Sequence, residues 1–298
     1  KWESLKVFVQ YGMLSDEKFY ERAVKFDLLT DLDGKYFTLE EYRTLTESEQ
    51  TDKDGQLVWL YTNDKEGQYS AIERAKEKGY SVLVLDGPLD VHAISQLEQK
   101  LEKTRFVRVD SDSIAKLIVK DEAKESHLSA EEQKTLSEIF KARLPKDEKR
   151  NYSVVFEALG AEADAVLITQ GEFMRRMQEM ARLPPGMNFY GDLPEGYNVV
   201  LNSDHALLSR LLSSEKSEIE PKLQSLRTEL AEQTKLVEDA RSAQSAKKPE
   251  EVTATEREEL SALAAKQAEI EGKINAELRA FGDREPLVGQ LVDLALLG

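Results

Sequence analysis

The sequence predicts an α/β (α+β) protein with a small, mostly parallel sheet, a second mixed region and a long antiparallel helical hairpin. Short apolar strands alternate with amphipathic helices over 56–112, which is typical of a parallel sheet covered by helices. Strand and helix patterns continue over 129–212. From position 219 onward, apolar residues repeat at heptad spacing, which indicates paired helices.

The first 50 residues are expected to be helical. "WESLKVFVQYG" predicts a helix that ends at Gly12, and "SDEKFYERAVKFDLL" predicts a second helix capped by Ser15. The stretch "DLDGKYF" is typical of a turn. Thr38 and Glu41 have the spacing of a capping box, which predicts that a third helix begins there.

The next segment has the clearest alternation of strands and helices. "QLVWLYT" and "RFVRVDSD" predict short strands, and "YSVLVLDGPLD" is apolar almost throughout, as expected for a strand buried on both faces. Two helices fill the intervals, "GQYSAIERAKEKG", which ends at Gly79, and "VHAISQLEQKLE". These elements predict parallel strands joined by helices.

A polar run over 121–132, "DEAKESHLSAEE", predicts a domain boundary. Ser129 and Glu132 then form a capping box at the start of another helix. "NYSVVFEAL", "DAVLITQ" and "YNVVLN" predict three strands. "SDHALLSRLL" predicts a helix whose first turn holds His205 as a surface or capping residue.

Two helices with matching apolar seams are predicted near the end of the sequence. The first seam consists of Ile219, Leu223, Leu226, Leu230 and Val237. Thr255 is expected to cap the second helix, whose seam is Leu260, Leu263, Gln267, Ile270, Ile274, Leu278 and Phe281. Matching seams joined by a polar loop favour an antiparallel hairpin, and two independent surface helices are the alternative. The final stretch, "LVGQLVDLALLG", is apolar on most sides, so it is expected to be buried, with a second chain as one candidate partner.

The composition limits the classes of partner. Asp and Glu number 57 against 41 Lys and Arg, a net charge of -16 that argues against nucleic acid as a partner. No run of about 18 uncharged apolar residues occurs, which argues against a membrane. The absence of Cys removes disulfides, thiolate metal sites and thiol catalysis, and it fits a reducing, cytoplasmic compartment. Because the sequence begins inside an amphipathic pattern without Met, we expect a piece of a longer chain.

Three carboxylates form the strongest candidate for a catalytic site. Asp86, Asp90 and Asp110 fall at the carboxyl ends of predicted parallel strands, where ligands bind in open α/β sheets. Clustered carboxylates suit Mg²⁺-dependent phosphotransfer, but no glycine-rich phosphate loop accompanies them, and the same residue types form ordinary turns. The three histidines lie far apart and lack metal-ligand spacing. We therefore expect no catalytic, cofactor-binding or metal-binding residue.

Four of the five methionines occur in "QGEFMRRMQEMARLPPGMNFYG", at 170–191. A helix over this stretch gathers its apolar residues in one arc, with Arg175 and Arg176 on the other side. The loop that follows adds more apolar residues. The apolar residues of the helix and of the loop are Phe173, Met174, Met177, Met180, Met187, Phe189 and Tyr190. Two interpretations stay open: an ordinary core face, or an exposed surface that uses flexible methionines to fit many shapes.

Seven stretches in order carry a family resemblance: "SDEKFYERA", "GKYFTLEEY", "YSVLVLDGPLDVHAISQLEQKLE", "RFVRVDSDS", "ITQGEFMRRMQEMA", "YNVVLNSDHALLSRLL" and "LVDLALL". Together they resemble the C-terminal half of the ninety-kilodalton heat-shock chaperone family, in the bacterial HtpG form of Bacteroides-like species. No single stretch is a catalytic signature. The resemblance extends over nearly the whole chain.

The resemblance implies a division of the chain. Residues 1–50 would be a helical linker of the middle domain, and 51–125 its small αβα sandwich subdomain. Residues 126–298 would be the C-terminal client-binding and dimerisation domain, with 215–283 as an inserted helical hairpin. In the family this domain normally ends with a further helix, before which this sequence stops.

The resemblance also implies a function. The chain would be part of an ATP-dependent molecular chaperone that acts in the heat-shock stress response, binds unfolded client proteins and forms a homodimer, with cochaperones as further partners. ATP and Mg²⁺ would bind in a part of the family not represented here, so no cofactor is expected in this chain. The seven apolar residues over 173–190 would bind client, and we call them the predicted client surface. The expected dimer interface consists of Leu287, Leu291, Leu294 and Leu297. A phosphotransfer enzyme and a coiled-coil interaction scaffold are the alternatives.

Overall fold

The structure is a computed structural model that describes residues 1–120, 126–147, 149–171, 175–176, 195–248 and 251–297. Its buried apolar residues form three clusters, two within residues 1–120 and one within residues 126–297. We call residues 1–120 the N-terminal body and residues 126–297 the C-terminal body. The domain boundary predicted at 125/126 adjoins residues outside the described part, and it stays a prediction.

The N-terminal body is a three-stranded sheet between helices, after a helical start. Its elements in chain order are α1 (Glu3–Ser15), α2 (Glu17–Ala23), β1 (Leu28–Thr30), β2 (Tyr36–Thr38), α3 (Leu39–Gln50), β3 (Leu57–Thr62), α4 (Tyr69–Glu77), β4 (Val82–Val84), α5 (Asp90–Lys100), β5 (Thr104–Arg108) and α6 (Ile114–Leu117). The sheet has the order β4-β3-β5, and both pairings are parallel, as predicted. β1 and β2 form a separate antiparallel pair.

The central strand β3 is buried on both faces, so helices cover the sheet from two sides. Leu57, Trp59 and Tyr61 pack into one apolar cluster together with residues of α1, α3 and α5. Val58 and Leu60 point into a second cluster, which includes residues of α4 and α6. This alternation follows from the period of two along a strand. The predicted sandwich of helices around a small parallel sheet is confirmed.

Two predicted helix boundaries near the start are wrong. Gly12 does not end the first helix, because α1 continues to Ser15. A Cβ at Gly12 would lie 2.6 Å from the ring of Phe19, so the glycine serves close packing and not a turn. Ser15 is not the cap of α2 either; Asp16 is, and its carboxylate accepts from the backbone N–H of Phe19 at 2.9 Å. The capping boxes at Thr38 and Ser129 are confirmed.

The C-terminal body combines a mixed sheet with five described helices. Its elements are α7 (Ala130–Lys141), β6 (Arg150–Glu157), β7 (Val166–Thr169), β8 (Glu195–Asn202), α9 (Ala206–Glu218), α10 (Glu220–Ser245), α11 (Ala254–Arg284) and α12 (Pro286–Leu297). The sheet has the order β6-β8-β7, with β6 parallel and β7 antiparallel to β8. One apolar cluster joins this sheet to all five helices.

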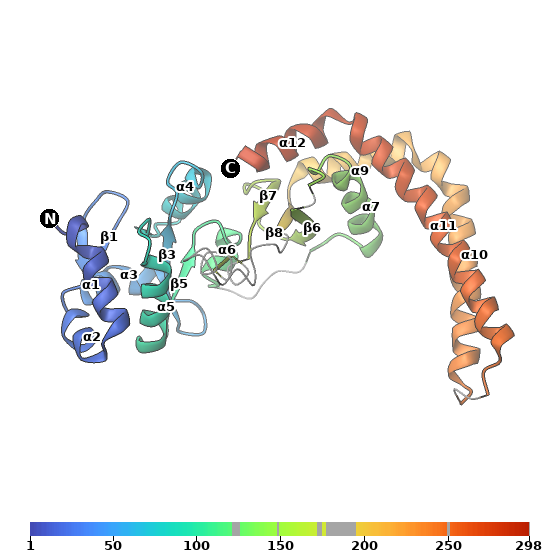
Figure 1. The fold of residues 1–298 in the computed structure, drawn as a ribbon. Helices are drawn as coiled ribbons and strands as arrows, with labels where there is room; N and C mark the ends of the chain where they lie inside the picture. Colours follow the sequence, from blue (N-terminus) through green and yellow to red (C-terminus); the bar gives the residue numbers. More distant parts are fainter. Residues whose placement is uncertain (121–125, 148, 172–174, 177–194, 249–250, 298) are drawn as a thin grey trace.

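α10 and α11 form the long antiparallel hairpin, which projects away from both sheets (Figure 1). The predicted seams lie between the two helices: Leu223 and Phe281 are fully buried, and Val237 and Ile270 nearly so. The alternative of two independent surface helices is therefore wrong. The predicted cap is also wrong, because Thr253, and not Thr255, forms the capping box of α11 with Glu256.

α7 lies against the last turns of α11 at the base of the hairpin. Phe140 on α7 and Phe281 on α11 have no exposed surface. Between them the two backbones approach so closely that a Cβ at Gly282 would lie 2.2 Å from the carbonyl oxygen of Ile139. The close approach of α7 and α11 therefore requires a residue without a side chain at position 282.

Candidate functional site

The predicted client surface lies outside the described residues. This applies to all seven of its members, Phe173, Met174, Met177, Met180, Met187, Phe189 and Tyr190. Whether they form a surface or a core stays a prediction. Within 172–194 the structure describes only Arg175 and Arg176.

Arg175 and Arg176 attach this stretch to the sheet of the N-terminal body. Arg175 is 2% exposed and donates from Nη2 to the hydroxyl oxygen of Tyr61 at 2.6 Å, while its guanidinium lies 5.7 Å from the centre of that ring. Arg176 donates from Nη1 to Glu98 Oε2 at 2.6 Å and from Nη2 to the carbonyl oxygen of Phe106. The helical pattern in the sequence placed both arginines on the side of the helix opposite the methionines. It contained no signal for partners on distant strands, so these contacts were missed.

A second polar contact joins the two bodies at the end of β6. Glu157 is 8% exposed, and its carboxylate accepts from Ser113 Oγ at 2.9 Å and from Lys116 Nζ at 2.5 Å. Nearby, Arg74 on α4 pairs with Asp164 at 2.9 Å. The bodies therefore meet through ion pairs and hydrogen bonds, the polar kind of contact typical of domains that move relative to one another.

Asp90 is a structural residue that joins α1 to the start of α5. It is 1% exposed and accepts from Lys6 Nζ at 2.8 Å and from Gln10 Nε2 at 2.6 Å. A third donor is the backbone N–H of Gly87 at 2.7 Å. A lysine, an amide and a backbone donor occupy three of the about four acceptor sites of this carboxylate. The adjacent ammonium group of Lys6 also repels a metal ion.

The other two candidate carboxylates do not join Asp90 in a site. Asp110 forms a pair with Arg108, Nε to Oδ1 at 2.5 Å, and also accepts from Gln68 at 3.1 Å. Asp86 is exposed. In the part of the chain that the structure describes, no group of three His, Cys, Asp or Glu has an arrangement that holds a metal ion.

Asp27 is a buried carboxyl group in the neighbourhood of Asp90. Burial raises the pKa of Asp27 to about 6; the charge of Lys6 opposes this shift and that of Asp90 adds to it. Because the pKa of Asp27 is higher in the folded than in the unfolded chain, its protonation stabilises the fold, and this contribution is complete at pH values below the ordinary pKa of Asp. That contribution is lost as the pH rises through about 6.

The histidines do not converge. His205 is the N-cap of α9, where its Nδ1 accepts from the backbone N–H of Leu207 at 3.1 Å, so the predicted capping role is confirmed. His127 lies 3.7 Å from Asp204, and His92 belongs to α5.

The four leucines expected at a dimer interface have different environments along α12. Leu291 is 8% exposed and packs in the core of its own body, and Leu287 is half-buried against the same core. Leu294 and Leu297 are 66% and 84% exposed. Within one chain the second half of this stretch is therefore exposed, and its burial against a second chain stays a prediction. Of the helices in the described ranges, none has the length and apolarity that crossing a membrane requires.

Comparisons with known proteins give one consistent result. Chaperone protein HtpG of Porphyromonas gingivalis is 57% identical over 302 residues, and chaperone protein htpG of Bacteroides fragilis is 48% identical over 297 residues. Each alignment covers 100% of this chain and 44% of the relative, so the chain spans less than half the length of these proteins. A solved middle domain of a Plasmodium falciparum heat shock protein is similar over 35% of the chain at 18% identity, with a TM-score of 0.28. No family model matches the chain.

Proposed function

Because the chain belongs to the HtpG family of heat-shock chaperones, we propose that it forms the client-binding and dimer-forming part of an ATP-dependent chaperone of the cytoplasm. The observation that carries this proposal is the 57% identity with chaperone protein HtpG of Porphyromonas gingivalis across the whole chain. In this proposal the chain has no catalytic centre of its own. ATP, Mg²⁺ and cochaperones bind to the whole chaperone. The alignment leaves 56% of the relative's length uncovered (100% less the 44% covered).

The predicted client surface over 173–190 is the proposed site of client binding. Full burial of one Met or Phe side chain contributes roughly 1.5–3 kcal/mol. Several such contacts, less the cost of association, give affinities on the order of micromolar, which suits repeated capture and release. The contacts of Arg175 and Arg176 support this proposal, because they connect the stretch to the N-terminal body, through which a movement driven by ATP would reach it.

Replacement of Met174, Met177 and Met180 by Ser is expected to weaken the suppression of client aggregation by about tenfold. The physical reason is that serine removes the apolar surface offered to unfolded chains. The measurement is light scattering of a denatured protein diluted into buffer at several chaperone concentrations. The matched control changes three exposed leucines elsewhere to Ser: Leu5, Leu45 and Leu236, which are 55%, 52% and 50% exposed.

Equal suppression by the methionine variant and the control variant would contradict the proposal. A methionine variant that loses its circular dichroism signal while the control keeps it would contradict the proposal as well. In that case the methionines belong to the core.

We propose that the exposed end of α12 contributes to a dimer contact. Leu294 and Leu297 present large apolar side chains to water in the single chain, and a symmetric contact between two copies would remove that surface. Light scattering is expected to give twice the 33.8 kDa chain mass for the unchanged chain. The double variant Leu294→Ser with Leu297→Ser is expected to have the mass of one chain, 33.8 kDa. A monomer without the substitutions, or a dimer that persists with them, contradicts this contact.

The alternatives have less support. Phosphotransfer needs carboxylates free to hold Mg²⁺, whereas Asp90 is enclosed by Lys6 and Gln10. A coiled-coil scaffold needs a free apolar seam, whereas the seam of α10 is used by α11.

A further inference from the structure

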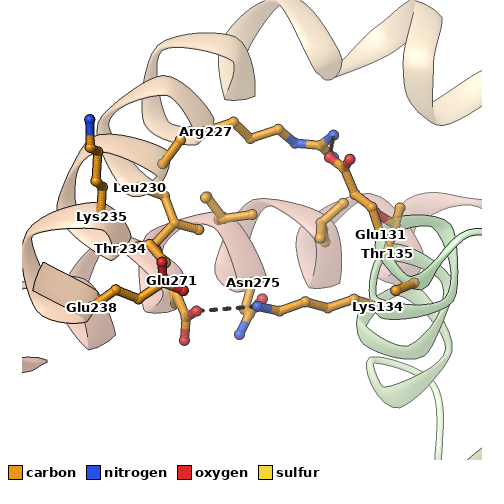
Figure 2. A pocket seen from close by; sticks show the side chains of 14 residues that line it. Glu131, Lys134, Thr135, Arg227, Leu230, Thr234, Lys235, Glu238, Glu271 and Asn275 are labelled. Carbon is orange, nitrogen blue, oxygen red and sulfur yellow. Dashed lines mark hydrogen bonds and ion pairs between the residues drawn. The ribbon is translucent and has the colours of Figure 1, made fainter. Parts of the chain in front are cut away.

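A pocket of about 560 Å³ lies between α7 and the base of the hairpin (Figure 2). Its apolar lining comes from all three helices: Ala130, Leu230, Ala231, Ile274 and Leu278. Figure 2 shows two ion pairs at its rim, Arg227 with Glu131 at 2.5 Å and Lys134 with Glu271 at 3.3 Å. Mostly apolar pockets of this size, with a few polar groups, are typical of ligand sites.

A second pocket, of about 370 Å³, shares Glu131, Thr135 and Arg227 with the first. It differs from the first in its charge. Four glutamates line the second pocket: Glu131, Glu132, Glu215 and Glu220. Among the described residues, its only two cationic side chains are Lys216 and Arg227. The excess of two negative charges (four less two) gives the pair of pockets one acidic end and one apolar end.

Buried acceptors in both pockets lack donors. Glu215 is 1% exposed, and its Oε1 accepts no hydrogen bond from the described residues; Arg227 Nη2 lies 3.6 Å away. Oε2 of Glu220 is also without a hydrogen bond, with Arg227 Nη1 at 3.3 Å but poorly oriented. In the first pocket, Oδ1 of Asn275 has no donor from the described residues either.

One arginine cannot satisfy this acidic end. The guanidinium of Arg227 is shared by Glu131, Glu215 and Glu220, and its one close contact is with Glu131. Burial raises the pKa of Glu215, an effect that the charge of Arg227 opposes without cancelling. An added cation with several N–H donors would satisfy the remaining acceptors.

We propose that the two pockets together bind a peptide segment of a partner protein in which a Lys or Arg is flanked by apolar residues. The basic side chain enters the acidic pocket and donates to Glu215 and Glu220. The apolar side chains occupy the first pocket, where a backbone N–H of the peptide reaches Asn275. A basic segment of a partner fits better than a second copy of this chain, whose net charge is -16. This site is separate from the predicted client surface, and it does not depend on it.

The test measures fluorescence anisotropy of a short labelled peptide with a central Arg between Leu residues, titrated with the full chain. Ala231 lines the first pocket and is exposed, so Ala231→Trp places a large side chain in that pocket. Glu215→Gln removes the buried negative charge of the second pocket and keeps the size of the side chain. Each is expected to weaken binding about tenfold. The matched controls Ala265→Trp and Glu232→Gln change exposed hairpin residues that do not line the pockets, and they are expected to bind as the unchanged chain does.

Two further peptides keep the test decisive even if a variant folds poorly by circular dichroism. One replaces the Arg by citrulline, which has nearly the same shape without the charge, and the other replaces the Leu residues by Ser. Both are expected to bind the unchanged chain about tenfold more weakly. The proposal is overturned if either peptide binds the unchanged chain as tightly as the original peptide, with its central Arg between Leu residues, does. Undiminished binding to folded Ala231→Trp overturns it too.

Discussion

Gly282→Ala is expected to lower the free energy of unfolding of the C-terminal body by about 2–3 kcal/mol, as overpacking of a close helix contact does. The added methyl group would lie 2.2 Å from the carbonyl oxygen of Ile139 and 2.9 Å from its carbonyl carbon. Both atoms belong to the backbone of α7, so no side-chain rotation relieves the clash. The helices must separate, which loosens the packing of Phe140 and Phe281.

The same helix supplies the control. Gly272 also lies within α11, but a Cβ there meets nothing within 4 Å. Gly272→Ala is therefore expected to stabilise the body by about 0.5–1 kcal/mol, because alanine favours the helix. Urea unfolding followed by circular dichroism measures both. Equal effects of the two substitutions would show that α7 and α11 are not in close contact at Gly282.

Asp90→Ala is expected to cost the N-terminal body about 3–5 kcal/mol, the effect of removing one partner from a buried ion pair. The substitution leaves Lys6 and Gln10 without their acceptor. It also removes a negative charge that helps to raise the pKa of Asp27, so that pKa is expected to fall from about 6. Denaturant unfolding at pH 7 measures the stability, and NMR titration of the Asp27 carboxyl group measures the pKa.

Asp86→Ala is the control for this prediction. Asp86 is exposed, and its replacement is expected to change stability by less than about 0.5 kcal/mol. If Asp90→Ala leaves the chain as stable as Asp86→Ala does, Asp90 is not the structural anchor described here. A functional use for it would then have to be reconsidered.

Much of the fold could be predicted because local patterns determine it. The capping boxes at Thr38 and Ser129 have fixed spacing, and heptad spacing revealed the seams of α10 and α11. The continuous apolar run around Val82–Val84 indicated a strand buried on both faces. In each of these cases, neighbours within a few residues contain the whole signal.

Contacts between distant residues could not be predicted in this way. Gly12 resembles a helix end in sequence, but Phe19 from the next helix needs its missing side chain. Asp90 resembles a ligand at a strand end, but its partners lie on α1, 80 and 84 residues away. Arg175 resembles a solvent-facing residue until Tyr61 is placed beside it. Each of these residues depends on tertiary packing, which no local spacing records.

The pairing of α7 with α11 has a consequence for biosynthesis. Glu138 on α7 binds Arg279 on α11, 141 residues later, so the core of the C-terminal body closes only after α11 has left the ribosome. At a translation rate of about 5–20 residues per second, the nascent apolar face of α7 waits on the order of ten seconds for its partner. Over that interval the newborn polypeptide is itself open to aggregation.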